Sequence, residues 1–111
     1  MLAVRSEPIL LENIVALTLM RRFGTDDHVF FYNKNIEVDF VVPEHEIAIQ
    51  VCYRLHNNID DTFRRETSAL VAYKKFSQFK NLFIITYEEE EVLTVEDTEI
   101  KVLPIWKWLL E

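Results

Sequence analysis

Residues 36–53 decide the fold, and they read IEVDFVVPEHEIAIQVCY. Two runs rich in β-branched and aromatic residues, Ile36–Val42 and Glu46–Tyr53, flank a Pro-Glu-His segment, so we expect two antiparallel strands. A third run, His28–Tyr32, precedes them across Asn-Lys-Asn, a connection in which Asn can supply a positive φ. The three runs together predict an antiparallel meander.

Polar side chains occur within two of these strands, at positions where burial is expected. A period of two places Glu37 and Asp39 on one face of the first strand and apolar residues on the other, namely Val38, Phe40 and Val42. In the next strand Gln50 and Cys52 share a face. Adjacent strands would therefore bring Asp39 and Gln50 together. A carboxylate with an amide oxygen is a ligand set that Mg²⁺ accepts, and such an ion could activate water for phosphodiester cleavage.

Helices are expected on both sides of the meander. The segment Glu7–Phe23 starts with Ser-Glu-Pro, in which Ser6 can cap the first turn and Pro8 costs little. It ends at Gly24, which can take the left-handed position that follows a helix. Because its apolar residues cover more than one face, we expect this helix to be mostly buried. Two aspartates open a second helix, which is expected from 60 to about 79.

The C-terminal third predicts more strands. The continuous apolar run Leu82–Tyr87 is typical of a central strand buried on both faces, parallel to a neighbour because a long helix precedes it. Val92–Val95 and Glu99–Leu103 predict two further strands around a turn at Asp97, and Ile105–Leu110 a short helix. The order α-β-β-β-α-β with small additions predicts an α/β fold, a mixed sheet flanked by helices.

Composition excludes several classes of protein. The 111 residues form one expected domain, 1–111, and Gly24 is the only glycine, which excludes a P-loop and a dinucleotide-binding fingerprint. Cys52 with three histidines provides neither a disulfide framework nor a zinc site of usual spacing, which favours a reducing, cytoplasmic setting. No apolar stretch is long enough to span a bilayer, so no membrane partner is expected.

The net charge of -7 is concentrated at one end of the chain. Residues 88–111 carry eight acidic residues against two basic ones, whereas 58–87 carry three against five. Most of the acidity therefore lies outside the candidate site. Contact with nucleic acid, which needs a positive surface, is not excluded.

The chain resembles the C-terminal domain of unknown function found in a large family of bacterial and archaeal AAA-type ATP-binding proteins. The resemblance rests on the order of four motifs, Glu12-Asn13, Glu37–Val41, Gln50–Cys52 and Arg64–Glu66, and it continues to IWKWLL at the C-terminus. That domain is similar in fold to the restriction-endonuclease-like PD-(D/E)xK nucleases and to Holliday-junction resolvases. The resemblance implies a restriction-endonuclease-like core in this chain. Intact members of the family carry an ATPase module ahead of this domain.

The resemblance also implies roles for individual residues. Glu12 matches the carboxylate on the first helix, Asp39 the metal-binding aspartate, and Gln50 the Glu or Gln of the (D/E/Q)xK motif. Cys52 stands where the nucleases have a lysine, and a thiol cannot supply the charge of an ammonium group at neutral pH. Each residue also has a structural interpretation: Glu12 as a helix-surface carboxylate paired with a neighbouring arginine, Asp39 as an acceptor for backbone amides, Gln50 as a satisfied core amide, and Cys52 as a small buried hydrophobe.

Three functions remain open at this stage. The first is a non-catalytic accessory domain of an AAA-type ATP-binding protein, with a degenerate pocket, no cofactor, and an ATPase module as its partner. The second is a Mg²⁺-dependent DNA nuclease that uses Asp39 and Gln50, assisted by Glu12, with a lysine of the second helix replacing Cys52. The third is DNA binding without cleavage through the basic residues of that helix, Arg64, Arg65, Lys74 and Lys75.

Overall fold

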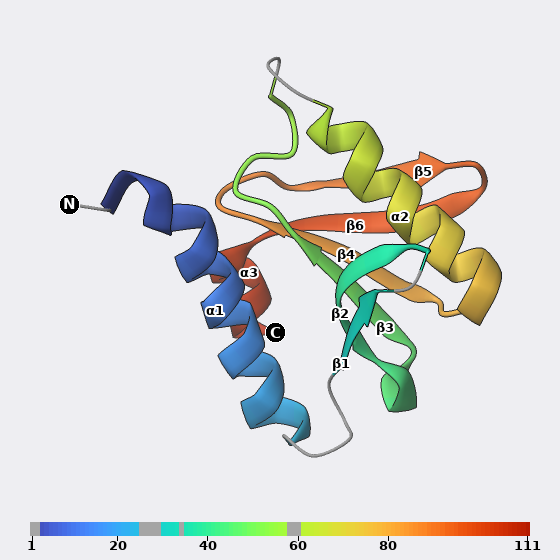
Figure 1. Cartoon of the computed structure of the whole chain (residues 1–111), viewed down its shortest axis with the longest axis horizontal. Helices are drawn as coiled ribbons and strands as arrows, with labels where there is room; N and C mark the ends of the chain where they lie inside the picture. Colours follow the sequence, from blue (N-terminus) through green and yellow to red (C-terminus); the bar gives the residue numbers. More distant parts are fainter. Residues whose placement is uncertain (1–2, 25–29, 34, 58–60) are drawn as a thin grey trace.

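A computed structural model describes residues 3–24, 30–33, 35–57 and 61–111. The helices are α1 (Ala3–Phe23), α2 (Thr62–Ser77) and α3 (Ile105–Leu110), with a 3-10 turn at Pro43–His45. The strands are β1 (Phe30–Asn33), β2 (Glu37–Val42), β3 (Ile47–Val51), β4 (Asn81–Thr86), β5 (Glu91–Val95) and β6 (Thr98–Pro104). These described strands form one sheet in the order β1-β2-β3-β4-β6-β5 (Figure 1).

The sheet is mixed, as predicted. Strands β1, β2 and β3 form the antiparallel meander, and α2 then leads to β4, which pairs parallel to β3. Strand β6 pairs parallel to β4 and antiparallel to β5, with which it forms a hairpin. The α-β-β-β-α-β order and the α/β class are confirmed. The two further strands and the short C-terminal helix are confirmed, and β6 lies inside the sheet with β5 at its edge.

Helices cover both faces of the sheet and enclose two separate apolar cores (Figure 1). On the α2 side the fully buried residues include Val38, Leu55, Leu70, Ile84 and Val102. On the side of α1 and α3 the core contains Val15, Leu19, Val42, Ile49, Ile85, Leu103 and Trp108. The central strand β4 supplies residues to both cores, which confirms the prediction from its continuous apolar run.

Some helix boundaries differ from the predicted ones. Helix α1 begins at Ala3, four residues before Glu7, so Ser6 and Pro8 lie inside the helix and not in its first turn. Proline at this position lacks the N–H of a regular helical hydrogen bond, and its ring crowds the carbonyl four residues before it. The predicted stop is confirmed: Gly24 has φ 92°, and its N–H donates to the Met20 carbonyl at 2.8 Å.

The second helix is shorter than predicted at its C-terminal end. Helix α2 ends at Ser77 because Gln78 adopts a left-handed conformation, with φ 64°, and its N–H donates to the Lys74 carbonyl. The turn of the C-terminal hairpin lies where it was expected, with both Glu96 and Asp97 at positive φ. The predictions for His28, Asp60 and the Asn-Lys-Asn connection fall wholly or partly outside the described residues.

None of the helices in the described part of the chain combines the length and the apolar character that crossing a membrane requires.

Candidate functional site

A bulge in β2 determines where Asp39 lies. Between the pairs that β1 makes with Val41 and with Val38, β2 advances three residues whereas β1 advances two, so β2 holds an extra residue. As a result Val38 and Val41 both pack in the core beneath α2, whereas Phe40 packs in the core beneath α1. The expected alternation, which placed Val38 and Phe40 on one face, is wrong here because the bulge interrupts the period of two.

Next to this bulge, hydrogen bonds from the side chains of Asp39 and Gln50 take the place of the backbone hydrogen bonds between β2 and β3. The regular pairs of the two strands end at Phe40 and Ile49. Beyond them, Gln50 Oε1 accepts a hydrogen bond from the Asp39 N–H at 2.9 Å, and Gln50 Nε2 donates to the Glu37 carbonyl at 3.1 Å. In return, Asp39 Oδ2 accepts from the Val51 N–H at 2.8 Å. The structure therefore brings Asp39 and Gln50 together, as the strand pattern predicted.

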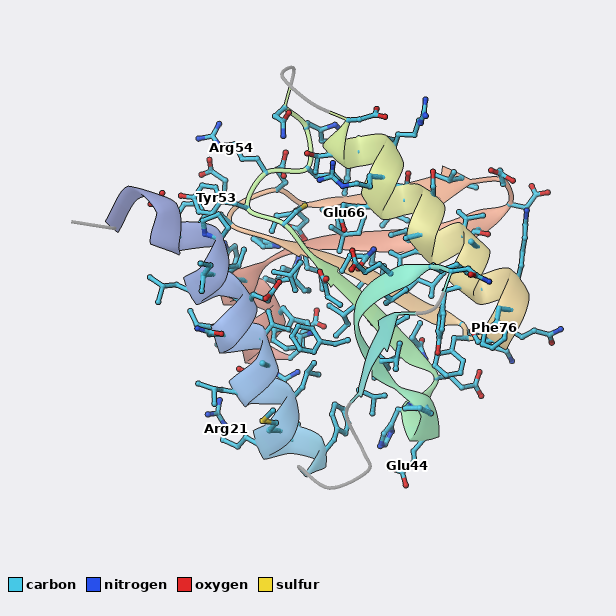
Figure 2. All side chains as sticks on the ribbon, viewed as in Figure 1. Arg21, Glu44, Tyr53, Arg54, Glu66 and Phe76 are labelled. Carbon is cyan, nitrogen blue, oxygen red and sulfur yellow. The ribbon has the colours of Figure 1, made fainter. Side chains whose placement is uncertain are left out.

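A cavity of about 300 Å³ opens between these strands and α2. Its polar lining includes Asp39, Gln50 and Glu37 from the sheet, and Arg65 and Glu66 from α2. Figure 2 shows Glu66 on the side of α2 that faces the sheet, and its side chain is only 14% exposed. The cavity is thus lined by acidic groups on both walls, with one arginine beside them.

Two carboxyl groups of this cavity hold their protons unusually well. Burial raises the pKa of Asp39 to about 6; the hydrogen bond from Val51 opposes this shift, and the charges of Glu12 and Glu37 add to it. Burial also raises the pKa of Glu66 to about 7, with a further contribution from Asp39. The neighbouring Arg65, whose Nε lies 3.9 Å from Glu66 Oε2, acts in the opposite direction.

The other two predicted site residues lie outside this cavity. Glu12 is exposed on α1 and affects Asp39 through its charge, but it does not line the cavity. Cys52 follows the end of β3 and packs against the core beneath α2. Burial and the negative charges of Glu66, Glu89 and Asp39 raise the pKa of its thiol to about 12, so Cys52 is uncharged at neutral pH.

The side chains of the predicted pair are engaged by backbone groups of β2 and β3. Both polar atoms of the Gln50 amide, and one carboxylate oxygen of Asp39, are already hydrogen-bonded to the backbone. Within the described ranges, no three residues among His, Cys, Asp and Glu are grouped so that they could hold a metal ion. These contacts match the structural interpretation of both residues, and Mg²⁺ binding stays a prediction.

The basic residues of α2 lie at its two ends. Arg64 Nε is 3.5 Å from Asp61 Oδ2 in the first turn, whereas Lys75 Nζ is 3.3 Å from Glu96 Oε1 in the last. Lys74 and Lys75 are about 12 Å further along the helix than Glu66 and do not line the cavity. Among the described residues, Arg65 is the basic side chain that lines the cavity. DNA binding through this helix stays a prediction.

Glu66 is a residue of the cavity that the sequence pattern does not predict. A signal was present, because Glu66 lies three residues after Phe63 and four before Leu70 on the stripe of α2 that packs against the sheet. A carboxylate on the apolar stripe of a helix must be accommodated by burial near other polar groups. The polar side chains of Asp39 and Gln50 lie on the opposite wall of the cavity.

The chain is similar to part of a longer archaeal protein. The chain is 39% identical over 108 residues to an uncharacterized protein of Methanocaldococcus jannaschii, MJ1544. The match covers 91% of this chain and 24% of the relative, so the chain spans about a quarter of the length of the curated relative it matches. It therefore corresponds to a domain within that longer protein. No protein-family model and no solved structure matches the chain.

Proposed function

We propose that this chain is a non-catalytic accessory domain of a larger, AAA-type ATP-binding protein, and that its nuclease-like pocket now serves the fold. Its correspondence to one quarter of a longer archaeal relative supports the role of a module within a larger protein. The motifs that resemble the C-terminal domain of AAA-type ATP-binding proteins support the identity of that larger protein, and the mixed sheet fits a restriction-endonuclease-like core.

The proposal that the domain is non-catalytic rests on the hydrogen bonds of the Gln50 side chain. A metal-binding amide presents its oxygen to the ion, whereas Gln50 Oε1 accepts the Asp39 N–H and Gln50 Nε2 donates to the Glu37 carbonyl. Gln50 is 3% exposed, and its removal would leave two backbone groups without partners. Its position is explained by strand pairing alone.

The lysine position supports the same conclusion. Cys52 carries no charge at neutral pH and packs against apolar residues, so it cannot stabilise a developing phosphate charge. Lys74 and Lys75, the candidates to replace it, do not line the cavity. Among the residues that the structure describes, the pocket is thus lined by no lysine, the residue that the resemblance requires for cleavage.

A metal-dependent nuclease is the second candidate, and Glu66 is the observation that favours it. Glu66 and Asp39 line one cavity from opposite walls, and the pKa of each is raised partly by neighbouring carboxylates. Like charges brought together in a cavity are typical of sites that bind cations or transfer protons. In this alternative Arg65, not a lysine, would be the cation of the site.

Plasmid nicking separates the two candidates. We expect the chain with Mg²⁺ or Mn²⁺ to nick supercoiled DNA no faster than its Asp39→Ala and Glu66→Ala variants, with exposed Glu99→Ala as the matched control. Calorimetric titration with Mn²⁺ should give no saturable binding that depends on Asp39. Nicking that disappears in both cavity variants and persists in Glu99→Ala would establish the nuclease and overturn the accessory role.

The AAA-type part of the proposal is tested on the longer relative. We expect the part of MJ1544 outside the region that matches this chain to bind a fluorescent ATP analogue, and to bind this chain when the two are mixed. Absence of ATP binding would refute the AAA-type assignment. ATP binding without binding of this chain would refute the role of accessory partner.

A further inference from the structure

Helix α1 keeps a second apolar side that no described part of the chain covers. Leu11, Val15 and Leu19 face the sheet and are buried. Outside this buried face, five large apolar side chains are between 41% and 62% exposed: Ile9, Leu10, Ile14, Leu17 and Met20. Figure 1 shows α1 at the margin of the molecule, with the sheet and α3 on one side only. The prediction that this helix is mostly buried is therefore wrong: one side is buried, and the exposed remainder has the composition of a contact surface.

The outer side of α1 has a regular stripe. Its members follow one another at intervals of three, four, three and four residues, which is the spacing of the seam between paired helices: Glu7, Leu10, Ile14, Leu17 and Arg21. The three central positions are apolar, whereas the two ends carry opposite charges. Glu7 and Arg21 each lie seven residues from Ile14. Leu10 lies four residues before Ile14 and Leu17 three residues after it, so the stripe is nearly symmetric about Ile14.

This symmetry identifies the occupant of the stripe. A second copy of α1 in the antiparallel direction would place Ile14 against Ile14, Leu10 against Leu17, and Glu7 against Arg21 at both ends. A parallel copy would place like charges together. Neither Glu7 nor Arg21 forms an ion pair with another described residue, and Figure 2 shows Arg21 extending away from the sheet. The charges therefore select a second antiparallel copy.

A hollow next to the stripe gives the second copy a place to insert. Its volume is about 180 Å³, which is enough for one leucine side chain, and α1 contributes Glu7, Leu10, Leu11 and Ile14 to its lining. The opposite wall is formed by Ile105 and by the stacked rings of Tyr53 and Tyr87, whose centroids are 4.9 Å apart. In the antiparallel arrangement Leu17 of the second copy lies beside Leu10, at the edge of this hollow.

We propose that the chain forms a symmetric dimer through antiparallel pairing of α1, with Ile14 on the two-fold axis and Glu7 paired with Arg21 of the other copy. This inference does not depend on the function proposed above. One helix per copy makes a small interface, so we expect a dissociation constant of about 10 µM.

Analytical ultracentrifugation of the 111-residue chain over a range of about 1 to 200 µM tests the dimer. We expect a species of twice the 13.3 kDa mass at high concentration. Leu17→Glu should weaken dimerisation at least a hundredfold, and Leu17→Ala, which preserves helix propensity, about tenfold. Val92→Glu on edge strand β5 is the matched control, since Val92 is 63% exposed and Leu17 62%. A chain that stays monomeric at 200 µM, or a dimer that survives Leu17→Glu, overturns the proposal.

Charge reversal tests the antiparallel direction. Glu7→Arg and Arg21→Glu, each alone, place like charges opposite each other at both ends of the interface and should weaken the dimer about tenfold. The double variant restores opposite charges only if the helices are antiparallel, so we expect it to recover wild-type affinity. Failure of the double variant to recover would reject the antiparallel pairing. Circular dichroism of each variant checks that the exposed substitutions leave the fold unchanged.

Discussion

The side-chain oxygen Oε1 of Gln50 on β3 accepts a hydrogen bond from the backbone N–H of Asp39 on β2, with an N to Oε1 distance of 2.9 Å. The other end of the Gln50 amide reaches the Glu37 carbonyl at 3.1 Å, so one side chain satisfies a donor and an acceptor of β2. This happens beyond the last regular pair of β2 and β3, next to the bulge. The residue that the motif order suggested as a metal ligand thus completes the pairing of two strands.

Replacement of Gln50 by Leu should destabilise the fold. The substitution removes the partners of the Asp39 N–H and the Glu37 carbonyl in a partly buried position, which costs about 1 to 3 kcal/mol in the free energy of unfolding. Urea unfolding followed by tryptophan fluorescence measures the loss. Thr94→Leu on the exposed face of β5 is the control and should change stability by less than about 0.5 kcal/mol. Equal stability of Gln50→Leu and wild type would contradict the structural role of this amide.

The Glu66 carboxyl should make stability depend on pH. Its pKa is raised to about 7 in the folded chain, against an ordinary value of 4.5, so the folded state holds a proton that the unfolded state releases. The free energy of unfolding therefore falls as pH rises from about 4.5 through 7. Glu66→Gln removes this loss: it should match wild type at pH 4.5 and be more stable by about 1 to 2 kcal/mol at pH 8.

Thermal unfolding at pH 4.5, 6 and 8 measures this dependence. The exposed Glu99→Gln is the control and should follow the wild type at every pH. If Glu66→Gln loses stability at pH 8, the Glu66 carboxylate makes a favourable ionic contact, and the raised pKa is refuted.

Cys52 should react slowly with alkylating reagents. Burial and nearby carboxylates raise the pKa of its thiol to about 12, so the thiolate that attacks iodoacetamide is about a thousandfold scarcer at pH 8 than for an ordinary cysteine. Mass spectrometry of the modified chain over time gives the rate. The same chain in concentrated urea serves as its own control and should react at the ordinary rate. Rapid alkylation of the folded chain would restore Cys52 as a candidate nucleophile.

The element order could be predicted from sequence because it depends on local signals. Apolar runs of strand length, the left-handed stop at Gly24 and the turn at Asp97 each act within a few residues. The meander and the contact between Asp39 and Gln50 followed from the period of two. The bulge in β2 did not, because it is defined by pairing with β1, and a single extra residue leaves no mark in the composition of β2.

Long-range polar contacts were also beyond the reach of the sequence pattern. Glu89 belongs to a run of four glutamates, yet its carboxylate alone among them accepts the N–H groups of Leu55 and His56, at 2.5 and 2.9 Å. Glu66 follows two arginines on α2, and it lines the cavity opposite Asp39 and Gln50. In both cases the carboxylate meets residues more than 10 positions away in the sequence, which only the fold brings near.

Arg22 should connect α1 to α3 in a way that lysine cannot reproduce. Its Nη2 donates to the carbonyls of Trp108 and Leu109 at 3.0 and 3.2 Å, and its guanidinium lies 4.7 Å from the centre of the Trp108 ring. A lysine keeps the charge but loses the planar stacking and the fixed donor geometry. We expect Arg22→Lys to lower the free energy of unfolding by about 1 to 2 kcal/mol and to change the fluorescence of the buried Trp108.

The neighbouring Arg21→Lys is the matched control. Because Arg21 is exposed, its replacement should change the free energy of unfolding by no more than about 0.5 kcal/mol. The measurement is made at 1 µM chain, a concentration below the expected dimerisation range. Equal effects of the two substitutions would show that α3 is held by its apolar contacts alone.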